Sequence, residues 1–244
     1  MAQHSDRIWQ SAEVVQRFLR GTRGALPLAT YQIEILLRLV KANNPTLNTF
    51  LDLGCGDGIL GRYLLAKYPT AEGVFLDFSE PMLTAARQAL AEKSNIHFVS
   101  QDYGEPGWTE SLKQWQPFDV IVSGFSIHHQ PDARKREIYQ ELYDLLRPGG
   151  IFLNLEHVSS PTAWLTHLSE ELMIDGLYAY EQEQHSALSR EAIAANFYNR
   201  SDQSANILAS VEEQNQWLRD IGFAQVDCYV KVFEFALFGG VRPA

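Results

Sequence analysis

The middle of the sequence alternates short apolar runs with amphipathic segments, and this alternation restricts the fold more than any other feature. Strand-length runs separated by helix-length segments are typical of a parallel β-sheet covered by helices. The runs are apolar at nearly every position, as in strands buried on both faces. The sequence therefore predicts an α/β fold. The runs are TFLDLG, GVFLDF, NIHFVS, FDVIVSG and GGIFLNLEHV, and the amphipathic segments lie near 59–68, 81–93, 108–115 and 132–146.

Two segments depart from this alternation and are predicted to be helical additions. Residues 1–48 place Ile33 and Leu36 at helical spacing, which predicts an N-terminal helical cap. Residues 158–209 are rich in Glu, Gln, Ser and Ala and contain no clear strand, so we expect a helical insert or lid after the fifth strand. Residues 49–244 then form the main domain, which includes the insert.

The end of the chain returns to sheet-like sequence. Ser210 and Glu213 form a capping box that opens a helix over 211–221. The runs AQVDCYV and KVFEFALF follow with almost nothing between them, which predicts a tight antiparallel hairpin. The apolar ending packs either inside the sheet or against a second subunit, so a homodimer is one interpretation.

Charge and cysteine usage exclude several classes of protein. The 244 residues include 20 Lys+Arg and 30 Asp+Glu, a net charge of −10, and no basic run, which disfavours nucleic acid as a partner. Cys55 and Cys228 are too few and too far apart for a disulfide framework or a zinc motif, so no metal is expected. No apolar stretch approaches the length of a membrane span. These features predict a cytoplasmic enzyme without a membrane partner.

A glycine-rich loop follows the first strand, in the stretch LDLGCGDGILG over 51–61. Glycine is favoured there because the backbone turns sharply and approaches a ligand without a Cβ in the way. Asp52 and Asp57 flank the loop, and their charges would repel a pyrophosphate but suit a ligand with an ammonium and a sulfonium group. Such a loop also occurs in nicotinamide enzymes, but this alternative fits the acidic charge of the loop less well.

Acidic side chains end the next two strands. Asp77 lies about 20 residues beyond the loop, where a carboxylate accepts both hydroxyls of a ribose. Asp102 and Tyr103 follow the third strand and offer an acidic side chain beside an adenine edge. The sequence thus predicts a nucleoside site along this edge of the sheet.

His128 and His129 close the fourth strand, at the edge where open parallel sheets bind ligands. An imidazole there can take a proton from an acceptor oxygen or nitrogen near neutral pH. The alternative is that one histidine only shapes the pocket. Adjacent side chains of an extended segment point to opposite faces, so we do not expect the two histidines to share a metal. Glu156 and His157 end the fifth strand and are weaker candidates for the acceptor pocket.

Several of these motifs, in this order over residues 49–157, resemble class I S-adenosylmethionine-dependent methyltransferases: LDLGCGDG, Asp77, Asp102 and LLRPGGIF. The resemblance implies a Rossmann-like seven-stranded, mostly parallel sheet with an antiparallel last strand, and S-adenosylmethionine as cofactor. It also implies methyl transfer to an oxygen or nitrogen of a small-molecule acceptor. The cofactor-binding residues that it implies, besides Asp77 for the ribose and Asp102 for the adenine, are Asp52, Gly54, Cys55, Gly56, Phe78, Met82, Tyr103 and Ser123.

A second resemblance covers nearly the whole chain. The opening DRIW, Tyr31 and the ending WLRDIGFAQVDCYVKVFEFALFGG are similar to the carboxy-S-adenosylmethionine synthase family. In that family a tyrosine and an arginine hold the extra carboxylate of the donor; Tyr31 occupies the tyrosine's place, and Arg190 and Arg200 are rival candidates for the arginine. This resemblance implies an alternative function in tRNA wobble-uridine modification, although the loop 54–58 differs from that family. A third alternative is a donor-binding subunit without catalysis of its own.

Overall fold

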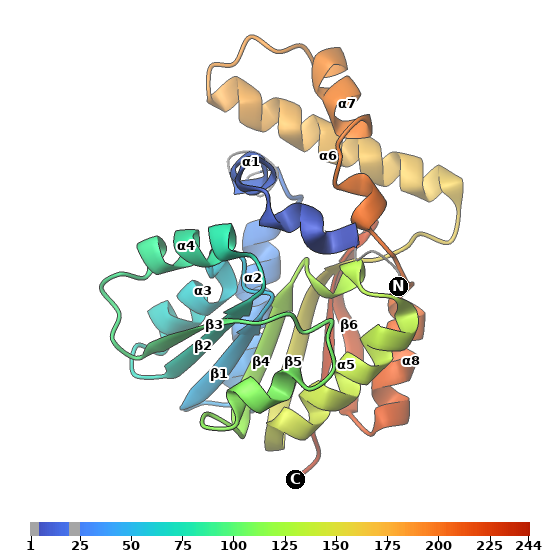
Figure 1. Ribbon diagram of the computed structural model, residues 1–244. Coiled ribbons are helices and arrows are strands. Elements are labelled where there is room, and N and C mark those ends of the chain that lie inside the picture. The colour runs from blue at the N-terminus through green and yellow to red at the C-terminus, as the bar shows by residue number, and fades with distance from the viewer. Residues whose placement is uncertain (1–4, 20–24) are drawn as a thin grey trace.

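The computed structural model describes residues 5–19 and 25–244 and contains a seven-stranded sheet (Figure 1). Residues 1–4 and 20–24 of the predicted cap lie outside the described residues. The strand order is β3-β2-β1-β4-β5-β7-β6, and β7 alone runs opposite to the other six strands. The predicted α/β fold with a reversed last strand is therefore confirmed. The strands are β1 (Thr49–Leu53), β2 (Glu72–Asp77), β3 (Ile96–Ser100), β4 (Phe118–Gly124), β5 (Leu146–His157), β6 (Ala224–Val232) and β7 (Phe235–Val241).

Helices cover both faces of the sheet because successive strand side chains point to opposite faces. Phe50 packs in one apolar core, with helices α2, α3 and α4, and Leu51 packs in the other, with α5, α8 and the short 3-10 helix η3. Both side chains are fully buried, as the near-continuous apolar runs predicted. The helices are α2 (Ala29–Asn43), α3 (Ile59–Lys67), α4 (Glu80–Ala89), α5 (Asp132–Leu145), η3 (Trp108–Leu112) and α8 (Val211–Ile221).

Local sequence signals fix several element ends. The capping box of Ser210 and Glu213 opens α8, and Gly222 ends it with a φ of +114°. The amphipathic segment expected near 108–115 forms only the 3-10 helix η3.

The remaining helices lie over the carboxyl ends of the strands (Figure 1). They are η1 (Ser5–Gln10) and α1 (Ala12–Arg17) from the start of the chain, and α6 (Ala163–Glu183) and α7 (Arg190–Tyr198) from the segment after β5. Ala25, Met173 and Phe235 form a small apolar cluster beneath α6. These helices therefore cover the edge of the sheet where the sequence predicts the ligand site.

The strand β7 is inserted between β5 and β6, and its side chains Phe235–Phe238 are buried. The apolar ending thus packs inside the sheet, and a homodimer stays a prediction. Among the described helices, none combines the length and the apolar character needed to cross a bilayer.

Candidate functional site

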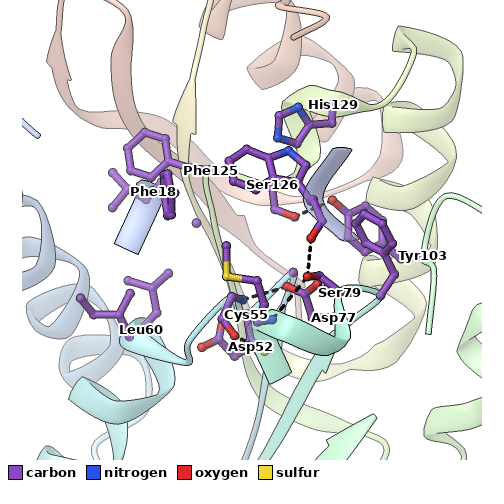
Figure 2. A pocket seen from close by; sticks show the side chains of 18 of the residues that line it. Phe18, Asp52, Cys55, Leu60, Asp77, Ser79, Tyr103, Phe125, Ser126 and His129 are labelled. Atoms are coloured by element: carbon purple, nitrogen blue, oxygen red, sulfur yellow. Dashed lines mark hydrogen bonds between the residues drawn. The ribbon is translucent and has the colours of Figure 1, made fainter. Parts of the chain in front are cut away.

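A cavity lies at the carboxyl ends of β1, β2 and β4 (Figure 2). We refer to it as the donor cavity. Parallel strands bring their carboxyl ends to one edge, so residues far apart in the sequence meet there. Of the predicted cofactor-binding residues, those that line the cavity are Asp52, Gly54, Cys55, Gly56, Asp77, Phe78, Met82, Asp102 and Tyr103.

The glycine loop after β1 has a left-handed backbone. The φ angles of Gly54, Gly56 and Gly58 are +62°, +56° and +78°. A Cβ on Gly54 would lie 1.9 Å from the Oγ of Ser126, so glycine is required there for space as well as for conformation. The N–H of Gly61 donates to the Asp52 carboxylate at 2.8 Å, which ties the following helix α3 to β1.

Asp77 ends β2 and stabilises the glycine loop through hydrogen bonds. Its carboxylate oxygens accept hydrogen bonds from the backbone N–H groups of Gly56 (2.9 Å) and Ser79 (2.8 Å). Burial raises the pKa of Asp77 from 3.8 to about 6, against the lowering effect of these hydrogen bonds. Asp102, which accepts the Gly104 N–H at 2.7 Å, raises it further.

The lining of the donor cavity is acidic. Asp52, Asp77 and Asp102 line it, and none of its lining residues within 5–19 and 25–244 is a lysine or an arginine. This charge fits a cationic ligand and disfavours a pyrophosphate. Burial, together with the carboxylates of Asp77, Asp52 and Asp57, raises the pKa of the Cys55 thiol well above its usual value, so Cys55 does not act as a nucleophile.

Two predicted cofactor residues lie away from the cavity. Tyr31 is 64% exposed on α2, because Gln32, Ile33 and Leu36 occupy the buried side of that helix. Ser123 is fully buried within β4, and its hydroxyl donates to the Leu53 carbonyl at 2.9 Å. Ser126, slightly further along the chain, lines the cavity instead.

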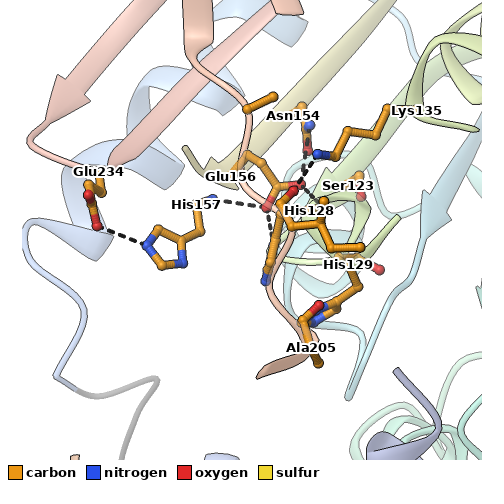
Figure 3. Close-up of polar contacts among 12 residues, drawn as sticks. Ser123, His128, His129, Lys135, Asn154, Glu156, His157, Ala205 and Glu234 are labelled. Atoms are coloured by element: carbon orange, nitrogen blue, oxygen red, sulfur yellow. Dashed lines mark hydrogen bonds and ion pairs between the residues drawn. The ribbon is translucent and has the colours of Figure 1, made fainter. Parts of the chain in front are cut away.

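His128 and His129 lie in a one-turn 3-10 helix, η4 (Ile127–His129), and not in an extended strand end (Figure 3). Their ring centroids are 3.9 Å apart, so the expectation that they point to opposite faces is wrong. The strand β4 ends at Gly124, and Phe125 turns the chain with a φ of +52°. Adjacent side chains of a 3-10 helix are about 120° apart around the axis, which lets the two rings meet.

Glu156 holds His128 through hydrogen bonds (Figure 3). It is fully buried, and its carboxylate accepts the backbone N–H of His128 at 3.0 Å, the ring Nδ1 of His128 at 2.5 Å and the N–H of His157 at 2.9 Å. Burial raises the pKa of Glu156 and lowers that of His128. Glu156 therefore supports the histidine turn and does not line either cavity.

The His129 ring has a defined tautomer. Its Nδ1 lies 3.1 Å from the Ala205 carbonyl oxygen, which only accepts, so Nδ1 carries the proton. Burial lowers the pKa of His129 to about 3, and the ring is neutral at pH 7. Its Nε2 thus has a lone pair available to accept a proton.

A second cavity adjoins the first beneath α6 and α7, and we refer to it as the acceptor cavity. Its polar wall includes His128, His157, Glu234, Arg200 and Asp202. The Nε2 of His157 lies 3.2 Å from a carboxylate oxygen of Glu234, and the His157 ring stacks on the Phe235 ring. Of the aromatic residues in the segment after β5, Phe197 lines it. The residues that line both cavities are Trp9, Phe18, Leu26, Phe125 and His129.

Sequence reasoning missed Trp9, Phe18 and Gln32, which reach the donor cavity from the predicted cap. The Ser79 hydroxyl donates to the Trp9 carbonyl at 2.5 Å and fixes η1 over the end of β2. The periodicity of apolar residues predicts a helix but does not predict where that helix packs on the rest of the protein. The apolar tryptophan in the polar opening of the chain was the available signal.

Comparisons with known proteins agree with this geometry. Residues 51–152 match the family model described as a methyltransferase domain. The chain is 28% identical over 222 residues to the carboxy-S-adenosyl-L-methionine synthase of Wolinella succinogenes, covering 88% of this chain and 85% of the relative. It is 32% identical over 125 residues to the demethylmenaquinone methyltransferase of Leptospira interrogans, covering 49% of this chain and 47% of the relative.

A solved structure shows the same fold. Human N-acetylserotonin methyltransferase in complex with S-adenosylmethionine superposes with a TM-score of 0.60 at 15% identity. The match covers 100% of this chain and 60% of that chain, so the protein spans less than two thirds of the length of its structural neighbour.

The sheet order, the glycine loop and the acidic donor cavity define a class I methyltransferase. Residues 51–152 thus form a methyltransferase domain of the S-adenosylmethionine-dependent type, and S-adenosylmethionine is its cofactor.

Proposed function

We propose that the protein transfers the methyl group of S-adenosylmethionine to an oxygen or nitrogen of a small molecule bound in the acceptor cavity. The observation that carries this proposal is the shared boundary of the two cavities, which includes His129. A group held in the donor cavity faces the acceptor cavity across this boundary. The division into a cap (1–48) and a main domain with a lid (158–209) belongs to the same proposal.

The donor-cavity residues suit each part of the donor. The Asp77 carboxylate is placed to accept ribose hydroxyls, and Asp102 and Tyr103 to contact the adenine. When bound, S-adenosylmethionine supplies a methyl group already activated by its sulfonium. The aromatic faces of Phe18 and Phe125 at the boundary attract a cation and exclude water from it.

His129 is the residue best placed to remove a proton from the acceptor. Its neutral ring lines both cavities, and the Ala205 carbonyl fixes the tautomer with the lone pair on Nε2. A general base is most effective when its pKa lies near the working pH, so a ring with a pKa of about 3 contributes less than the usual factor of about 10²–10⁴ in rate, and holding the reactants in line contributes the larger share. His128, tied to Glu156, positions the turn that carries His129 and lines the acceptor cavity.

Carboxy-S-adenosylmethionine formation is the second candidate function. It is favoured by the relative that aligns over 85% of its own length. Arg200 lines the acceptor cavity and is the arginine placed to meet a donor carboxylate. Arg190 is instead engaged on the surface by Glu171 and Asp175, and Tyr31 faces away.

The associated tRNA role finds no support in the basic side chains near α5. Arg134 pairs with Glu141, Lys135 is fully buried against Asp132, and Arg147 pairs with Asp119. Arg136, the exposed member of this group, lies over the Trp217 ring. Paired cations of this kind do not form an open phosphate-binding patch.

Denaturing mass spectrometry of the ligand carried through purification separates the two functions. We expect S-adenosylmethionine or S-adenosylhomocysteine, and recovery of the heavier carboxylated donor would favour the second candidate. Incubation with methyl-labelled S-adenosylmethionine and a panel of phenols, carboxylic acids and amines then tests transfer directly. Asp77→Ala should abolish donor binding in calorimetry, and an unchanged affinity would refute the proposed donor site.

A further inference from the structure

Gln32 lies in the first turn of α2, lines the donor cavity and is 1% exposed. Its side-chain Nε2 donates to the Pro27 carbonyl at 3.3 Å, which identifies the nitrogen end of the amide. The amide oxygen, Oε1, is buried and has no hydrogen-bond partner among the described residues. Buried amide oxygens in folded proteins are nearly always paired, so an unpaired one on a residue that lines a ligand cavity indicates that the ligand supplies the donor.

The position of Gln32 identifies the part of the ligand that meets it. Asp77 and Asp102 stand at the ends of β2 and β3 and take the nucleoside half of the donor. The helix α2 packs against β5 and α3, and β1 and β4 separate β5 from β2 in the sheet. A donor that spans the cavity with its nucleoside toward β3 therefore directs its amino-acid half toward α2.

The chemistry of the two groups is complementary. The amino-acid half carries an α-ammonium, which only donates hydrogen bonds. The Asp77 oxygens already accept N–H groups of Gly56 and Ser79, whereas the Gln32 oxygen has no partner within the described part of the chain. A neutral amide oxygen binds an ammonium through a charge-assisted hydrogen bond and adds no further negative charge to this acidic cavity.

We infer that the Gln32 Oε1 accepts a hydrogen bond from the α-ammonium of the bound donor, so that α2 of the N-terminal region recognises the amino-acid half of S-adenosylmethionine. This inference rests on the donor site of the proposed function. It adds a donor-binding residue outside the loop and strand-end motifs of residues 49–157.

The test compares two ligands by calorimetry: S-adenosylhomocysteine and 5′-methylthioadenosine, which lacks the amino-acid half. Removing a hydrogen bond to a charged group weakens binding by about 10-fold or more. Gln32→Leu should therefore weaken S-adenosylhomocysteine about 10-fold and leave methylthioadenosine within about twofold of the wild type. Gln32→Glu, which keeps an acceptor oxygen, should retain S-adenosylhomocysteine binding. Thr30→Val, on the exposed side of α2, is the matched control and should change neither affinity.

Each other outcome overturns a specific statement. Equal weakening of both ligands by Gln32→Leu would mean that Gln32 acts on the fold, and no weakening of either would mean that it does not contact the donor. Asp77→Asn should weaken both ligands, because both carry the ribose. If Asp77→Asn weakens neither, the donor site itself is wrong, which separates that failure from a failure of Gln32 alone. Should Gln32→Leu fail to fold, Gln32→Met, which also removes the amide oxygen, carries the test with the same expected ratio of the two affinities.

Discussion

The Glu156 carboxylate accepts hydrogen bonds from both the backbone N–H and the ring Nδ1 of His128, at 3.0 and 2.5 Å. The end of β5 is thereby joined to the turn after β4, and that turn carries His129, which lines both cavities. Because Glu156 is fully buried, its oxygens meet only protein donors, including the N–H of His157.

Glu156→Gln should destabilise the protein by about 1–3 kcal/mol. The substitution replaces one accepting oxygen by an amide N–H₂, which only donates, so at least one buried N–H group loses its acceptor. Urea unfolding followed by circular dichroism measures this. Glu110→Gln is the control: Glu110 is exposed and paired only with Lys113, so its loss should cost no more than about 0.5 kcal/mol. Equal stability of the two variants would contradict the role of Glu156.

Gly54→Ala and Gly107→Ala form a matched pair. Both glycines have left-handed backbones, with φ of +62° and +79°, so each substitution should cost about 1–2 kcal/mol of backbone strain. A Cβ at Gly107 meets nothing within 4 Å, whereas one at Gly54 meets Ser126. Only Gly54→Ala should also lose binding of S-adenosylhomocysteine in calorimetry; loss in both variants would point to a general effect on the fold.

Ligand-free stability should depend on pH through Asp77. Folding raises its pKa from 3.8 to about 6, so its favourable contribution is complete below pH 3.8 and is lost as the pH rises through 6. Asp77→Asn removes this dependence. The gain in stability of the variant over the wild type should therefore be larger at pH 8 than at pH 4, by up to about 3 kcal/mol, in thermal or urea unfolding. A gain independent of pH would show that Asp77 is ionised throughout.

Donor binding should show the opposite dependence on pH. The cationic donor favours ionised Asp77, so its affinity should fall as the pH drops below about 6. Calorimetric titration of S-adenosylmethionine between pH 5 and 8 measures this, and Asp77→Asn should bind weakly at every pH. An affinity that rises toward low pH would contradict the assignment.

His129→Gln should lower kcat by at most about 10² on an acceptor found in the labelled-methyl screen, because a base with a pKa of about 3 is weak. The pKa of His129 is lowered to about 3, so the base stays unprotonated, and kcat at saturating donor should not fall between pH 8 and 5. The value of kcat/KM for the donor should decrease as the pH drops below about 6, because kcat/KM reflects the ionisation of Asp77 in the free enzyme. A kcat unchanged by the substitution would leave His129 with a role in shaping the pocket only.

Much of the donor cavity followed from local sequence. Alternating apolar runs fix strands and helices through hydrogen bonding and burial between near neighbours. The glycine loop and the acidic residues Asp77 and Asp102 directly follow or end their strands, and parallel strands deliver such ends to one edge. For this reason the sequence placed Gly54, Gly56, Asp77 and Asp102 together.

The acceptor side depended on contacts that no local pattern encodes. The His129 ring is oriented by the Ala205 carbonyl, 76 residues later, and both cavities are closed by Trp9 and Phe18 from a separate segment. The turn that brings the two histidines into contact begins at Phe125, a non-glycine residue with positive φ that carries no sequence signal. The sequence by itself determined the sheet and the donor loop, because their causes lie within a few residues. Only the tertiary structure decided the acceptor cavity and the tautomer of His129, because packing between distant segments sets them.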